Sequence, residues 1–148
     1  MEFRSFLIKY AEIGVKGRNR GIFEDALVRQ IRHALKRCEG EFAVRRTRGR
    51  VYVEVLSESY DYEETVEGLK TVFGIAQICP MIELKDEGFE SLCSAVVSYM
   101  GEAYPDRNLT FKVNTRRARK DYPMESMEVG GVLLDAYPEM RWTCIIPR

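Results

Sequence analysis

The sequence predicts an α+β fold made of short strands and amphipathic helices. Short segments that alternate between apolar and polar residues indicate half-buried strands, and longer segments with apolar residues every three to four positions indicate helices. A third observation is the order of these segments. In the first part of the chain they run β-α-β-β-α-β, which is the element order of a ferredoxin-like sandwich, and a further α/β unit follows.

The first predicted strand and helix occupy residues 3–9 and 19–38. Asn19 is a residue type that favours the N-cap position of a helix, and Gly40 suits the C-terminal end. The helix carries an apolar stripe that should face the sheet. The stripe comprises Ile22, Phe23, Ala26, Leu27, Ile31, Ala34, Leu35 and Cys38. The outer face carries the cations Arg20, Arg29, Arg32, Lys36 and Arg37.

A hairpin, a second helix and a strand complete the predicted sandwich. Residues 42–46 and 51–56 read as strands, and the turn between them contains a glycine, as hairpin turns often do. Asp61 and Glu64 have the spacing of a capping box, so they should open the second helix. Residues 75–84 form the next strand, in which a proline favours an edge position.

The chain is predicted to form two small domains that follow each other without a flexible linker. We place the first at residues 1–75 and the second, an incomplete α/β domain, at residues 76–148. The predicted elements of the second domain are a helix at 88–103, a basic strand at 109–116, a helix at 126–136 and a last strand at 142–146.

Composition excludes several functional classes. With 45% hydrophobic residues in 148, the chain can bury a core. It has no apolar run of membrane-spanning length and no signal-peptide pattern, so we expect a cytoplasmic protein that does not bind membranes. Four cysteines without a C-x-x-C pair and a single histidine argue against a zinc or other metal site. Cys38 and Cys93 fall on apolar helix stripes and should be buried.

Charge is distributed unevenly along a chain whose net charge is zero. Residues 1–50 contain 13 Lys or Arg against 6 Asp or Glu, whereas residues 51–148 contain 10 against 17. Such asymmetry indicates a directed binding face. No catalytic constellation is visible. The phosphate-binding motifs G-x-x-x-x-G-K-[ST] and G-x-G-x-x-G are both absent from the sequence.

Three basic clusters are the candidate binding sites. Arginine dominates them, and its planar fork suits bidentate contact with phosphate. Two interpretations stay open: a surface that grips a nucleic-acid backbone, or ordinary solvated charge. The clusters are Lys16, Arg18 and Arg20; then Arg45, Arg46, Arg48 and Arg50; and finally Lys112, Arg116, Arg117, Arg119 and Lys120.

Four ordered motifs resemble the tRNA 4-thiouridine synthetases, also called tRNA sulfurtransferases. Residues 11–24 are similar to the "GEI-x-LKG-x-NR-x-x-FE" stretch of that family, and residues 46–53 to its "RTRGR-x-YV" hairpin. Residues 72–75 are similar to its "VFGI", and residues 111–123 to its "FKV-x-x-RRA-x-K-x-FP" segment. The motifs keep their order along nearly the whole chain.

The resemblance implies an N-terminal ferredoxin-like domain followed by a THUMP domain, which together bind tRNA by its 3′ CCA acceptor end. In that family a catalytic domain adenylates U8 with ATP and Mg²⁺ and replaces its O4 with sulfur. A cysteine desulfurase supplies the sulfur, and some members also serve thiamine biosynthesis. That catalytic domain is expected to lie outside this sequence, so we assign no catalytic residue and no cofactor here.

Two departures from the family pattern concern the second domain. Residues 126–131 are shorter than the family spacing by about one helical turn. Residues 141–148 read like the family sequence translated in a shifted frame, so we expect a THUMP domain that is incomplete at its end. Alternative functions stay open: a THUMP module of another tRNA-modifying enzyme, such as a methyltransferase; a ferredoxin-like regulatory module that binds a small ligand; or an adaptor that only binds other proteins.

Overall fold

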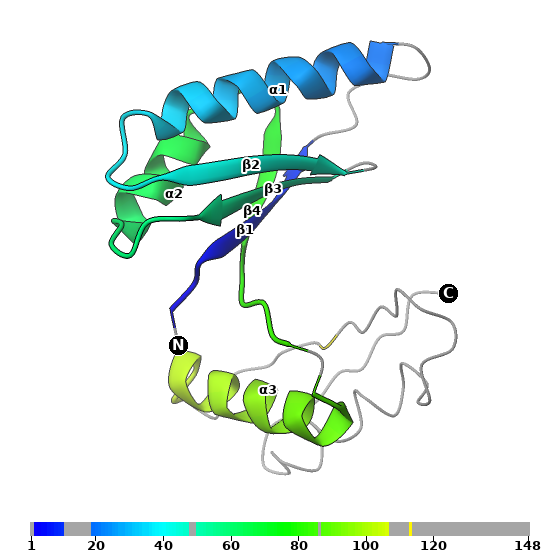
Figure 1. The fold of residues 1–148 in the computed structure, drawn as a ribbon, viewed down its shortest axis with the longest axis vertical. Helices are drawn as coiled ribbons and strands as arrows, with labels where there is room; N and C mark the ends of the chain where they lie inside the picture. Colours follow the sequence, from blue (N-terminus) through cyan, green and yellow to red (C-terminus); the bar gives the residue numbers. More distant parts are fainter. Residues whose placement is uncertain (1, 11–18, 48–49, 86, 107–112, 114–148) are drawn as a thin grey trace. The chain divides into compact units, whose positions relative to one another are not determined.

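A computed structural model describes residues 2–10, 19–47, 50–85, 87–106 and 113. The chain divides into two compact units, Glu2–Glu83 and Leu84–Arg148, which we describe separately (Figure 1). The predicted elements at 109–116 (apart from residue 113), 126–136 and 142–146 lie outside the described residues, and so does the tail at 141–148.

The first unit has the predicted element order. Its elements are β1 (Ser5–Tyr10), α1 (Asn19–Leu35), β2 (Phe42–Thr47), β3 (Arg50–Val55), α2 (Tyr62–Lys70) and β4 (Ile75–Met81). The strands form one antiparallel sheet in the order β2-β3-β1-β4, so β1 lies between β3 and β4. The prediction of a ferredoxin-like α+β sandwich is confirmed.

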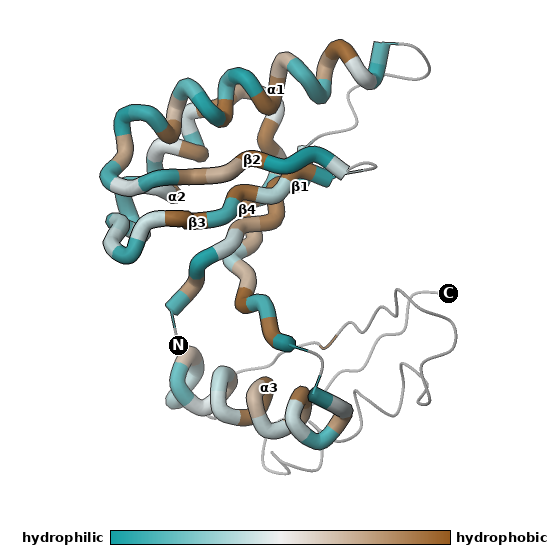
Figure 2. Tube along the Cα trace, viewed as in Figure 1, coloured by the Kyte–Doolittle hydropathy of each residue, from teal (hydrophilic) through white to brown (hydrophobic). Residues whose placement is uncertain are grey.

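The core lies between the two helices and one face of the sheet. Phe6 and Ile8 of β1 are fully buried opposite Val53 and Val51 of β3, and Ile31 of α1 is fully buried as well. Alternate residues on these strands are more exposed, because successive side chains point to opposite faces of a sheet. Figure 2 shows the resulting succession of apolar and polar positions along the strands and α1.

The buried face of α1 differs from the predicted stripe at one end. Ile22 is 69% exposed, so its assignment to the core was wrong, and Val28 is buried instead. At about 100° per residue, Ile22 lies almost opposite to Leu27 and Ile31 of the buried face. The helix also ends at Leu35, before the predicted position.

The predicted capping box of α2 is half confirmed. The Asp61 side chain is the N-cap and accepts a hydrogen bond from the Glu64 N–H at 2.8 Å. The Glu64 carboxylate does not return to Asp61 but accepts from the Glu39 N–H at 2.8 Å. This contact ties the start of α2 to the loop that follows α1.

Strand β4 lies at an edge of the sheet, as the proline within it predicted. It pairs with β1 from Met81, opposite Ser5, to Ile75, opposite Tyr10. The first compact unit therefore includes β4 and extends to Glu83, whereas the sequence placed the boundary at 75/76.

Gly40 is required at the turn between α1 and β2. Its φ is +117°, and an added Cβ would lie 2.9 Å from the Ser57 Oγ. We expect Gly40→Ala to lower the free energy of unfolding by about 1–3 kcal/mol, the usual cost of a strained backbone position. Urea unfolding measures this effect. Gly21→Ala is the control, since open space surrounds Gly21 within α1 and alanine favours helix. Equal stability of the two variants would contradict the argument.

The second unit is described mainly by one helix, α3 (Phe89–Ala103), close to the predicted 88–103. It begins after Gly88, whose φ is +101°. Cys93 on this helix is half-buried, and so is Cys38 in the first unit. Both thiols are therefore more exposed than the sequence predicted. Among the described residues, no helix is long and apolar enough to cross a membrane.

Candidate nucleic-acid interface

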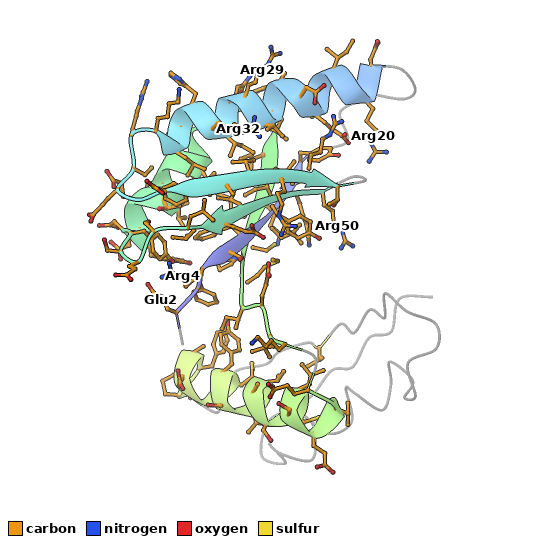
Figure 3. The ribbon with its side chains drawn as sticks, in the orientation of Figure 1. Glu2, Arg4, Arg20, Arg29, Arg32 and Arg50 are labelled. Atoms are coloured by element: carbon orange, nitrogen blue, oxygen red, sulfur yellow. The ribbon has the colours of Figure 1, made fainter. Side chains whose placement is uncertain are left out.

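Three of the predicted binding residues gather at one end of the first unit, which we call the basic end: Arg20, Arg46 and Arg50. Arg20 lies in the first turn of α1, Arg46 near the end of β2 and Arg50 at the start of β3. The Arg46 guanidinium donates to the Gly21 carbonyl at 3.2 Å, which joins β2 to the start of α1. Figure 3 shows Arg20 and Arg50 at this same end.

A buried carboxylate organises the basic end. Glu24 of α1 is only 7% exposed. Its Oε1 accepts hydrogen bonds from the Tyr10 hydroxyl and from the Arg20 Nε, the latter at 3.0 Å, while Arg46 lies 3.5 Å from its Oε2. Three separate segments, β1, α1 and β2, therefore meet at one side chain. Sequence reasoning missed this role, although Glu24 belongs to the first motif that carries the resemblance.

The contacts around Glu24 change the acidity of both partners. The hydrogen bond from Tyr10 and then the neighbouring Arg20 lower the pKa of Glu24 below its ordinary value. Burial, followed by the hydrogen bond to Glu24, raises the pKa of Tyr10. Glu24 is therefore held as a carboxylate and Tyr10 as a neutral phenol near neutral pH.

Arg46 points towards α1 because of its register. It lies opposite Val51, on the sheet face that the helices cover, and it reaches Asp25 at 2.9 Å in addition to Glu24. Arg20 and Arg46 are thus ion-paired, so their positive charge is partly neutralised. Their first role is to fix the start of α1 against the sheet.

Arg50 differs from Arg46 because it lies on the other face of the sheet. It is exposed and has no carboxylate partner among the described residues. Arg45 of β2 lies on the same face of the sheet, opposite Tyr52, and pairs with Glu54 of β3. The other predicted binding residues lie outside the described part of the chain: Lys16, Arg18, Arg48, Lys112, Arg116, Arg117, Arg119 and Lys120.

The structure describes no group of three or more His, Cys, Asp or Glu side chains that could hold a metal ion within its described ranges. Burial raises the pKa of the Cys38 thiol, and that of the Cys93 thiol. The sheet order and the basic end define the class of protein: a ferredoxin-like α+β domain with arginines at one end, followed in the chain by a second unit.

Comparison with known proteins identifies the family. The model of the ThiI ferredoxin-like domain matches residues 5–79, about half of the chain, and the THUMP domain model matches residues 87–141. The chain belongs to the ThiI ferredoxin-like family and carries a THUMP domain. The resemblance to tRNA sulfurtransferases noted in the sequence is thereby confirmed.

Two relatives and one solved structure illustrate the similarity. The chain is 58% identical over 143 residues to a probable tRNA sulfurtransferase of Lachnospira eligens, and 54% identical to one of Agathobacter rectalis. In each case 94% of this chain is covered, but the chain spans only 36% of the relative's length. A crystal structure of a 4-thiouridine synthetase–RNA complex with bound ATP matches 99% of this chain and 36% of that one, at 26% identity and a TM-score of 0.70.

Proposed function

We propose that this chain is the tRNA-binding part of a tRNA sulfurtransferase, the family enzyme that converts U8 of tRNA to 4-thiouridine. The observation that carries the proposal is the pair of domain matches, ferredoxin-like and then THUMP, in the order that the family uses. The basic end adds a physical reason, because exposed arginines such as Arg50 can contact phosphates directly.

In this proposal the chain holds the acceptor end of tRNA and leaves the chemistry to a catalytic domain outside its span. ATP and Mg²⁺ would act in that domain, and a cysteine desulfurase would deliver sulfur there, in the cytoplasm. A link to thiamine biosynthesis is proposed on the same grounds, from the resemblance alone. We therefore assign this chain the recognition of tRNA and no reaction step.

The test is the affinity of the chain for unmodified tRNA across a salt series. About six phosphate contacts should give a slope of log affinity against log salt on the order of −4 to −5. Trimming the CCA end should weaken binding, because the proposal gives that end to the THUMP domain. Absence of binding even at low salt would contradict the proposed function. Unchanged affinity after trimming would move recognition to the first unit or make it non-specific.

A further inference from the structure

A second cationic feature lies on the first unit and belongs to none of the predicted clusters. A groove of about 370 Å³ lies between α1 and the segment that follows α2; Arg29, Gln30, His33, Arg37, Thr71 and Val72 are among its lining residues. Arg29 and His33 lie one turn apart on the same face of α1. Arg37 follows in the turn just after the helix, where its N–H donates to the Ala34 carbonyl at 3.2 Å. Figure 3 shows Arg29 on the side of α1 that faces away from the sheet.

The arginines of this groove differ from those of the basic end in their partners. Arg20 and Arg46 are ion-paired with Glu24, whereas Arg29 and Arg37 have no carboxylate partner within the described ranges. No Asp or Glu occurs from residue 26 to residue 38 of the sequence. An incoming anion therefore meets uncompensated charge in the groove and displaces no carboxylate from it.

The shape and lining of the groove suit a nucleic-acid backbone. Two guanidinium forks, Arg29 on α1 and Arg37 in the turn after it, can each bind phosphate oxygens in bidentate fashion. Val72, which is only 7% exposed, forms part of the floor of the groove, and the exposed Gln30 amide adds a polar group. The volume falls in the range of ordinary small-ligand pockets, which is enough for a phosphate and its sugar.

We propose that this groove is an additional tRNA contact, in which Arg29 and Arg37 bind backbone phosphates. The inference rests on the proposed function, since it takes tRNA as the ligand brought to this chain. The inference goes beyond the proposed function by assigning contacts to Arg29 of α1 and to Arg37 in the turn after it, which belong neither to the three basic clusters nor to the THUMP domain.

The experiment compares two double variants of the full chain in tRNA binding. Arg29→Gln/Arg37→Gln removes the groove cations. The control, Arg32→Gln/Lys36→Gln, removes the same charge from residues that line a separate hollow beside β2. Because Arg32 also donates to the Val44 carbonyl at 3.2 Å, urea unfolding must show that both double variants are folded. The groove variant should lose affinity on the order of tenfold at low salt, and its salt slope should become less steep by about 1.4–1.8. The control should change less, because in this proposal its two cations make no direct contact with a phosphate and act only through their charge.

Each outcome decides something different. If the unmodified chain binds tRNA but the groove variant binds it equally well, the groove assignment fails and the proposed function stands. Equal losses in both double variants would also overturn the groove, since the charge of α1 as a whole would then be responsible. No tRNA binding by the unmodified chain overturns both proposals.

A second measurement needs no variant to bind or to fold fully. NMR signals of the Arg29 and Arg37 Nε–H groups in the unmodified chain should shift when tRNA is added, and the Arg45 signal, which belongs to an ion pair on the far face of the sheet, should shift less. Unmoved Arg29 and Arg37 signals under saturating tRNA would overturn the groove assignment and leave an acidic protein as the ligand to test.

Discussion

Phe6→Ala is expected to lower the free energy of unfolding by about 3–5 kcal/mol, a large share of the stability of a small domain. Phe6 is fully buried on β1, opposite Val53, and its ring lies 5.9 Å from that of Tyr62 at the start of α2. The substitution removes a ring where the sheet meets a helix, and the rigid sheet cannot close the cavity. Chemical denaturation followed by circular dichroism measures the loss.

The matched control is Phe73→Ala, which removes the same ring from the turn before β4. Phe73 is 79% exposed, so the change in stability should stay within about 0.5 kcal/mol. A loss at Phe73 as large as that at Phe6 would mean that the burial seen here does not describe the folded chain. A small loss at Phe6 would mean the same.

Glu24→Ala is the second large effect, and we expect it to cost about 2–3 kcal/mol. The variant removes a nearly buried carboxylate that accepts from Tyr10 and Arg20 and pairs with Arg46. Because Arg20 and Arg46 are partly exposed, water can compensate them in part, which keeps the cost below that of a fully buried ion pair. Thermal and urea unfolding measure it.

Glu67→Ala serves as the control for Glu24→Ala. Glu67 makes an exposed ion pair with Lys70 on α2, and such pairs contribute about 0–1 kcal/mol. If Glu24→Ala proved as mild as Glu67→Ala, the carboxylate would not be the joint between β1, α1 and β2 that its contacts indicate.

The same carboxylate predicts a pH dependence whose sign follows from its pKa. The pKa of Glu24 in the folded chain lies below the ordinary value of 4.5, so the unfolded chain binds the proton more readily. The stabilising contribution is fully present above that value and is lost as pH falls through the lower, folded-state pKa. Unfolding experiments between neutral and acid pH should show a shallower acid loss in Glu24→Gln than in the unmodified chain.

Much of the first unit could be predicted from sequence because its signals are local. The alternation of apolar and polar residues predicted β3, and the helical spacing of Leu27, Ile31 and Leu35 predicted α1. The Asp61 cap predicted the start of α2. Each of these signals depends on residues within one or two turns, where steric and hydrogen-bonding preferences act directly.

The candidate site was predicted less well because it depends on pairing between distant segments. In the sequence Glu24 is next to Asp25 and resembles an ordinary surface acid. Its partners Tyr10, 14 residues earlier, and Arg46 of β2 contact it only in the folded chain. The direction of Arg46 depends on hairpin register, and a shift by one residue would turn it to the opposite face of the sheet. The sequence analysis named the cations Arg29 and Arg37, but the groove beside them forms only when Thr71 and Val72, which follow α2, pack near α1.

The sheet order has a consequence for synthesis on the ribosome. Strand β1 is made first, yet it lies between β3 and β4, so its second neighbour is a strand made about seventy residues later. Pairing over such a separation closes a long loop and slows folding. The nascent chain can complete this sheet only after Met81 has left the exit tunnel, by which time translation of the second unit is under way.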